Sequence, residues 1–151
     1  MNQSKDAARW IVLLEAGLAV PSEIIAWADA CIIASEKPSM DLIDLATTAP
    51  ELVDQISSHL TKMRSKIDLF DALRYASASL RESIEIGRAT PERIATFTYT
   101  YLCGHYSSVP DDLRYLYLAD DEFYLAVEEK YGDRESVVSR FMKALKNAER
   151  G

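Results

Sequence analysis

The residues best able to do chemistry in this chain of 151 residues are two histidines, two cysteines and a surplus of carboxylates. His59 and His105 are each isolated in the sequence. Cys103 and His105 form only half of a zinc ligand set, which usually has about four ligands in closely spaced pairs. We therefore expect His59 to face solvent, Cys103 to be a small core residue and His105 to interact with a helix C-terminus.

Pairs of carboxylates occur at helical spacing in two places. Asp41 and Asp44 are three residues apart, as are Glu82 and Glu85, so each pair lies on one helix face. Such a pair binds a cation or does acid–base work when it is held in a cleft, but it is more often a solvated surface. The chain also has no glycine-rich phosphate loop and no serine in a nucleophile-elbow context. We predict no catalytic residue, no metal site and no cofactor.

One segment, 99–131, combines tyrosine with negative charge. It holds seven of the eight tyrosines, and its seven acids against two bases give a formal charge of −5 out of −7 for the whole chain. Tyrosine is enriched at binding hot spots because it offers a large, stiff contact area with a polar tip. The alternative is that these rings pack the core with their hydroxyls at its rim. Residues 115–118 would point around a whole helix, so at least two tyrosines should be exposed.

The partner-binding site predicted within this segment consists of five residues. They are Tyr117, Tyr124, Asp120, Asp121 and Glu122. The two tyrosines lie seven residues apart, two turns along one helix face. The three adjacent acids lie between them, where Asp120 either extends the helix or caps a new one after a break at Ala119.

Helical periodicity extends over the whole chain and predicts eight helical segments. They cover about 5–16, 21–37, 40–45, 48–60, 68–86, 90–106, 111–131 and 133–145. The alternation of β-branched and aromatic residues in 97–101 is a strand signal, but the Thr90-Pro91 start favours a helix there. The connections are short, so consecutive helices should pack antiparallel.

Two junctions seventy residues apart read almost alike. Gly17-Leu18-Ala19-Val20-Pro21 is followed by Ile24 and Trp27, and Gly87-Arg88-Ala89-Thr90-Pro91 by Ile94 and Phe97. Glycine just past a helix end adopts the left-handed cap conformation, and proline suits the first position of the next helix. We expect equivalent helix-turn-helix corners, with Trp27 and Phe97 buried at matching places. Trp27 and Leu73 are predicted core residues.

The fold class predicted from these elements is an all-α, single-domain bundle of about seven or eight helices. The chain length suits one domain (1–151), with pseudo-repeated halves at about 1–66 and 67–151. Five glycines and five prolines leave little room for long linkers.

Charge and composition exclude several classes of function. A net charge of −7 argues against nucleic acid and anionic membranes as partners, since both need a basic face, and it permits a basic protein partner. The apolar run 10–14 is too short for a signal peptide, and no run reaches the length of a membrane span. Two cysteines do not make a disulfide framework, which fits a reducing cytoplasm.

In style and composition the chain resembles the small, acidic, helical immunity proteins of bacterial toxin systems. The resemblance covers Leu14-Glu15-Ala16-Gly17-Leu18 through Ile25-Ala26-Trp27-Ala28-Asp29 and the absence of a catalytic motif. Immunity proteins share no single motif, so no functional residue carries over. The resemblance implies that the partner is a toxin, often an enzyme with a basic active-site cleft, which the tyrosine-and-acid face would suit.

Two other functions remain open from the sequence. The same aromatic surface would serve a self-associating helical scaffold or adaptor, buried in a homodimer. Alternatively, the carboxylates converge on a metal in an enzyme. We favour a non-catalytic, cytoplasmic inhibitor that binds a basic protein.

Overall fold

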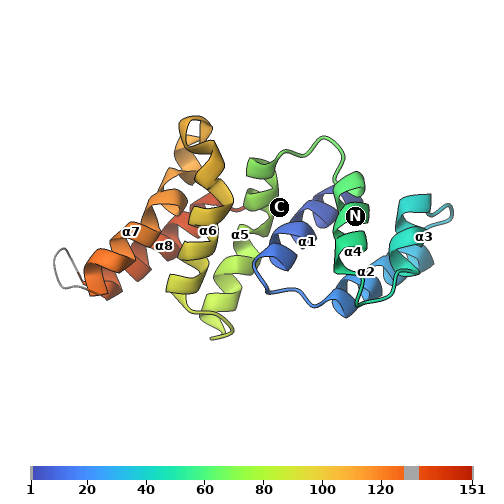
Figure 1. Cartoon of the computed structure of the whole chain (residues 1–151), viewed down its shortest axis with the longest axis horizontal. Helices are drawn as coiled ribbons and strands as arrows, with labels where there is room; N and C mark the ends of the chain where they lie inside the picture. Colours follow the sequence, from blue (N-terminus) through green and yellow to red (C-terminus); the bar gives the residue numbers. More distant parts are fainter. Residues whose placement is uncertain (1, 128–132, 151) are drawn as a thin grey trace. The chain divides into compact units, whose positions relative to one another are not determined.

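The protein is all-α, as predicted. The computed structural model describes residues 2–127 and 133–150, and this part of the chain contains no strand. The helices are α1 (Gln3–Glu15), α2 (Pro21–Ala34), α3 (Met40–Ala46), α4 (Val53–Met63), α5 (Leu69–Glu85), α6 (Pro91–Leu102), α7 (Arg114–Val127) and α8 (Arg134–Ala148), with short 3-10 helices η1 (Cys103–Ser108) and η2 (Asp111–Leu113) (Figure 1). Within these residues, no helix has the length and apolarity needed to cross a lipid bilayer.

The helices form two compact units, Met1–Ala76 and Ser77–Gly151. In the first unit α1 packs on α4, and α3 packs on both α2 and α4; in the second, α7 packs on both α6 and α8 (Figure 1). The division falls inside α5, later in the chain than the predicted boundary after residue 66. A common origin of the two halves stays a prediction.

Each unit has an apolar core of its own. Fully buried side chains in the first unit include Leu42, Leu45, Ile56 and Leu60, which join α3 to α4. Those in the second unit include Ile94, Leu102, Leu113, Leu116 and Phe141. Leu73 is buried as predicted.

The two glycine corners are built alike, as the sequence predicts. Gly17 has φ 72° and Gly87 has φ 75°. The two residues after each glycine donate their N–H groups to one carbonyl, four positions before the glycine. That carbonyl belongs to Leu13 in the first corner and to Ser83 in the second, and the distances are 2.8 and 3.1 Å in both. These bonds satisfy carbonyls that a helix end leaves without partners.

The helices that leave the corners also correspond. Pro21 and Pro91 are the first residues of α2 and α6. Trp27 and Phe97 occupy equivalent positions, but both are half-buried instead of buried. Each ring lies next to another aromatic ring of its own unit. The centres of the Trp27 and Trp10 rings, for example, are 6.3 Å apart. The prediction of full burial is therefore wrong, and the prediction that the two rings lie at matching places in space stays a prediction.

Replacing Gly87 by alanine should lower the free energy of unfolding by about 1–2 kcal/mol, because an L-residue resists the left-handed conformation. A Cβ at Gly87 would meet no atom within 4 Å, so the cost is one of backbone conformation and not of a clash. Chemical denaturation measures it. Gly104 is the matched control, since it has equal space for a Cβ and no positive φ. Equal losses for the two variants would contradict the cap argument.

The threonines of 97–101 lie within helix α6, where their hydroxyls donate to helix carbonyls. Thr98 donates to Ala95 at 3.1 Å, and Thr100 donates to Thr96 at 3.0 Å. This bonding gives the hydroxyls hydrogen-bond partners within the helix. The same Thr98 hydroxyl lies 2.6 Å from the carbonyl oxygen of Leu116 on α7, so its single proton is shared between the two carbonyls and ties the two helices together.

Helix α7 runs without a break through Ala119 and Asp120. Ala119 is fully buried, so the chain has a packing reason to continue as a helix there. Of the two alternatives for Asp120, the structure selects extension of the helix. The end of the predicted segment, 128–131, lies outside the described residues.

Candidate binding groove

One stripe of α7 carries four of the five predicted site residues. Tyr117, Asp120, Asp121 and Tyr124 follow the spacing of a single helix face. Val127 continues the stripe and is 71% exposed. An uninterrupted helix therefore aligns side chains that the sequence left on either side of a suspected break.

This stripe lies against α6, which runs antiparallel to α7. Thr96 on α6 donates a hydrogen bond to Asp120 at 2.7 Å. One turn further along α6, Tyr99 stacks on Tyr117 with 5.1 Å between ring centres and 30° between planes. These two contacts set the register of the pair of helices.

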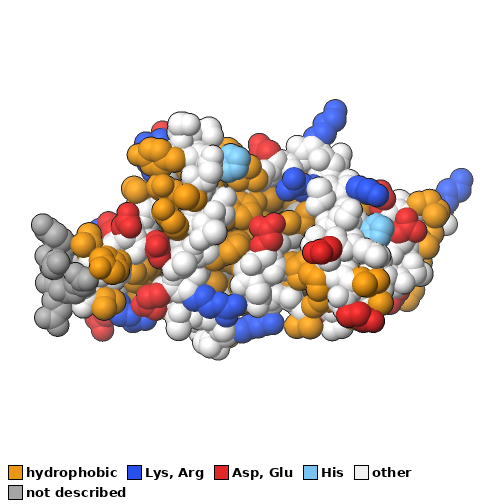
Figure 2. All heavy atoms as spheres, viewed as in Figure 1, with side chains coloured by type: hydrophobic (Ala, Val, Ile, Leu, Met, Phe, Trp, Pro, Cys, Tyr) orange, Lys and Arg blue, Asp and Glu red, His pale blue; other side chains and the backbone are white. Residues whose placement is uncertain are grey.

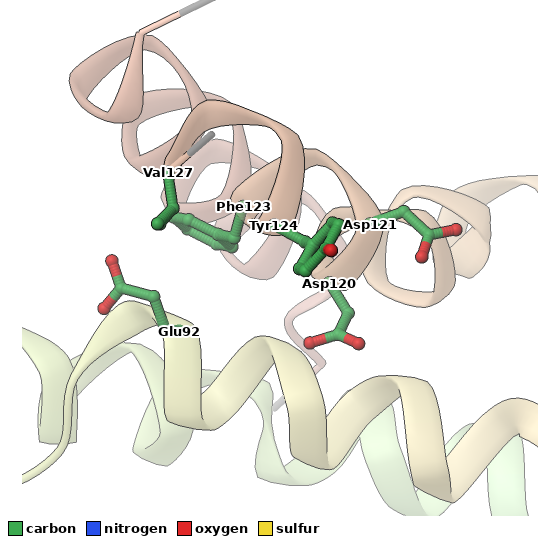
Figure 3. Close-up of a pocket in the computed structure, with 6 residues that line it drawn as sticks. All are labelled: Glu92, Asp120, Asp121, Phe123, Tyr124 and Val127. Atoms are coloured by element: carbon green, nitrogen blue, oxygen red, sulfur yellow. The ribbon is translucent and has the colours of Figure 1, made fainter. Parts of the chain in front are cut away.

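Where the two helices diverge there is a cavity of about 390 Å³, which we call the acidic groove (Figure 3). Its lining residues are Glu92 from α6 and Asp120, Asp121, Phe123, Tyr124 and Val127 from α7. Figure 3 shows Glu92 reaching toward α7 and Asp120 reaching toward α6. Phe123 is 3% exposed and forms an apolar floor, whereas Tyr124 is 64% exposed at the edge. The groove thus places carboxylates beside an apolar surface.

The carboxylates of the groove differ in their surroundings. Glu92 accepts a hydrogen bond from Arg134 at the start of α8. Burial raises the pKa of Glu92, but the hydrogen bond from Arg134, a backbone hydrogen bond and the charge of Arg134 together bring it below its usual range. In the described part of the chain, Asp120 and Asp121 form no ion pair with a basic side chain. Among the described residues, the two negative charges of Asp120 and Asp121 at the groove therefore have no basic partner.

Glu122, the fifth predicted site residue, does not line the groove. It accepts a hydrogen bond from the Tyr115 hydroxyl at 2.5 Å and lies 3.4 Å from Nη2 of Arg140 on α8. Burial, followed by the bond to Glu122, raises the pKa of Tyr115 well above its usual range. Glu122 therefore joins α7 to α8, because it points to a different side of the helix from Asp121.

The tyrosines divide between packing and exposure. Tyr117 is half-buried between Tyr99 and Tyr106, each at 5.1 Å between ring centres. Tyr106 and Tyr124 are 63% and 64% exposed, which confirms that at least two of them are exposed. Figure 2 shows hydrophobic and acidic side chains next to one another over α7.

Of the predictions for residues that could bind metal, those for Cys103 and His59 need correction, and the predicted interaction of His105 with a helix C-terminus stays a prediction. Cys103 is exposed and not in the core, and its hydrogen bond with the Tyr99 hydroxyl raises the pKa of Tyr99. His105 is exposed in η1, just past α6. His59 is half-buried, and its Nδ1 atom is buried without a hydrogen-bond partner among the described atoms, so it does not simply face solvent.

The sequence analysis missed Glu92, Phe123 and Val127 as groove residues. Val127 and Phe123 lie near the predicted stripe, and helical spacing alone would have included Val127. Glu92 lies 25 positions before Tyr117, the first residue of the predicted site, so only the antiparallel packing of α6 on α7 brings it there.

Fold and groove together define a class: an all-α protein whose second unit carries an acidic, partly aromatic surface groove. Comparisons with models of protein families, with characterised proteins and with solved structures find no match to the chain. The function is therefore argued from the groove itself.

Proposed function

We propose that this protein is a non-catalytic inhibitor that binds a basic protein partner through the acidic groove. The class that fits best is an immunity protein, and the partner is a toxin domain with a basic active-site cleft. The proposal places the protein in the cytoplasm, where the thiols of Cys31 and Cys103, neither of which is in a disulfide, would stay reduced.

The observation that carries the proposal is the pairing of charge with apolar surface. Asp120 and Asp121 have no basic partner in the described part of the chain, and they adjoin Phe123, Tyr124 and Val127. An arginine or lysine fits both features, because its aliphatic stem covers apolar surface while its charge meets a carboxylate. Within this chain, Arg134 already donates a hydrogen bond to the groove residue Glu92, which is an example of such a pair. Guanidinium–carboxylate pairs of this kind are strong and directional.

Inhibition follows from occupying the partner's cleft. A cleft that binds phosphate or another anion is lined with basic residues, and the acidic groove presents carboxylates in place of that anion. Opposite charges steer the encounter and raise the association rate, whereas buried aromatic contacts slow dissociation. The same negative field would repel nucleic acid, so the groove competes with such a substrate without binding it.

Replacing Asp120 and Asp121 by lysine should slow association with the partner at least about 10-fold at low ionic strength, because electrostatic steering is lost. The difference should shrink as salt is added. The partner to use is the product of the gene adjacent to that of this protein, measured by stopped-flow or surface plasmon resonance. Because Asp120 also accepts a hydrogen bond from Thr96, circular dichroism must show that the double variant keeps its fold. The single variant Asp121→Lys repeats the test and leaves that hydrogen bond in place.

The matched control makes the same change in net charge at two acids outside the groove. Asp29 and Glu36 are exposed acids of the first unit, and replacing both by lysine should leave most of the association rate intact. An equal loss in the control would mean that net charge, and not the groove, governs binding. A neighbouring product that does not bind, or a wild-type chain that dimerises through Tyr124, would contradict the proposal in favour of the scaffold.

A further inference from the structure

We infer that the first unit carries a binding site for a divalent transition-metal ion, of the Zn²⁺ type, formed by Asp41, Asp44 and His59. One ligand atom from each residue lies within 4.8 Å of the others. The two aspartates come from α3 and the histidine from α4. The site therefore joins two helices that are separate in sequence.

Local structure explains why the carboxylates meet the imidazole. Ser39 caps α3 by accepting the N–H of Leu42 at 3.2 Å, which fixes the first turn of a helix of only seven residues. Asp41 and Asp44, three apart, then share one face of that helix. Leu42 and Leu45 are buried and hold α3 against α4, whose residue His59 lies beside buried Leu60.

The three groups have no other partners that the structure describes. In this part of the chain, neither carboxylate forms an ion pair, and the buried Nδ1 of His59 has no hydrogen-bond partner. A buried polar atom without a partner costs free energy, and two close carboxylates repel each other. A bound cation would remove the carboxylate repulsion, and an imidazole nitrogen turned toward the carboxylates would complete the ligand set.

The donor set indicates the class of ion. Imidazole suits Zn²⁺ and similar ions, whereas Mg²⁺ and Ca²⁺ prefer oxygen ligands alone. Zn²⁺ binds nitrogen and oxygen at about 2.0–2.2 Å, so its ligand atoms lie roughly 3–3.5 Å apart. Binding would require side-chain rotations that bring the three ligand atoms from separations of up to 4.8 Å to that spacing. Three protein ligands leave one coordination position for water. With ligands from both helices, the bound ion would stabilise the packing of α3 against α4.

The test uses untagged, metal-free protein and metal salts alone. Calorimetric titration with ZnCl₂ should show one site per chain, with much weaker binding of MgCl₂. Asp41→Asn with Asp44→Asn should weaken Zn²⁺ binding at least about 100-fold, and His59→Gln at least about 10-fold. Excess Zn²⁺ should raise the Tm of the wild type by about 5 °C or more and that of the variants by much less. Co²⁺ supplies an absorption spectrum that reports nitrogen ligation.

Two control variants show whether Zn²⁺ binds at other residues of the chain. Asp111→Asn with Asp112→Asn removes two exposed carboxylates from the second unit, and Cys103→Ser with His105→Gln removes the exposed cysteine and the second histidine. Both should bind as the wild type does. If His59→Gln does not fold, the aspartate variant decides, because Asp41 and Asp44 are outside the core. Unchanged affinity in the aspartate variant, loss in a control, or equal affinity for Mg²⁺ and Zn²⁺ would overturn the site.

Discussion

Replacing Phe141 by alanine should lower the free energy of unfolding by about 3–5 kcal/mol, the usual cost of removing a buried phenyl ring and leaving a cavity. Phe141 on α8 is fully buried. Its ring meets Phe123 of α7 edge to face, with 5.9 Å between centres and 82° between planes, a geometry that adds to the stability from burial. Urea denaturation followed by circular dichroism measures the loss.

The control for this prediction keeps most of the volume. Phe141→Leu fills much of the site and should cost less than half as much as alanine. Because Phe123 forms the floor of the acidic groove, the leucine variant should also weaken partner binding while it remains folded. A loss below about 1 kcal/mol in the alanine variant would show that the helices of the second unit do not pack as described.

Replacing Tyr124 by alanine should weaken partner binding at least about 30-fold, equal to about 2 kcal/mol, as expected for a tyrosine at a hot spot. Stability should change by less than about 0.5 kcal/mol, because the side chain is 64% exposed and exposed positions tolerate substitution. The effect should appear mainly in the dissociation rate. Binding kinetics and a denaturation curve on the same protein separate the two quantities.

Two controls sharpen the result for Tyr124. Ile86 is similarly exposed, at 68%, and does not line the groove, so Ile86→Ala should bind as the wild type does. Tyr124→Phe keeps the ring and should retain most of the affinity if contact area is what matters. If Tyr124→Ala binds normally, the partner does not use the groove, and the proposed function loses the observation on which it rests.

The local elements follow from the sequence because their causes are local. Glycine in the sequence predicts a helix end, and Gly17 and Gly87 adopt the left-handed conformation found there. Pro21 and Pro91 begin the next helices. Thr90 caps α6 by accepting the N–H of Arg93. Each of these features depends on residues within a few positions of one another. The all-α class and most helix bounds could be predicted for this reason.

Exposure was harder to predict, because it depends on what packs against each face. Trp27 and Cys103 were expected in the core, yet Trp27 is half-buried and Cys103 is exposed. Glu122 has the same local sequence context as Asp121, but it turns toward Tyr115 and Arg140. Helical periodicity predicts that adjacent residues such as Asp121 and Glu122 point to different sides of the helix. It does not predict which side packs against another helix.

The sequence by itself determined the helices, the paired glycine corners and the two-turn spacing of Tyr117 and Tyr124. The structure decided that α7 continues through Asp120, which aligns Asp120 and Asp121 with the two tyrosines. Only the tertiary structure decided that Glu92 completes the acidic groove and that His59 joins Asp41 and Asp44. The physical reason is the range of the interactions. Capping and periodicity act over about one or two turns of chain, whereas a site assembled from two helices depends on burial of apolar faces that no local spacing records.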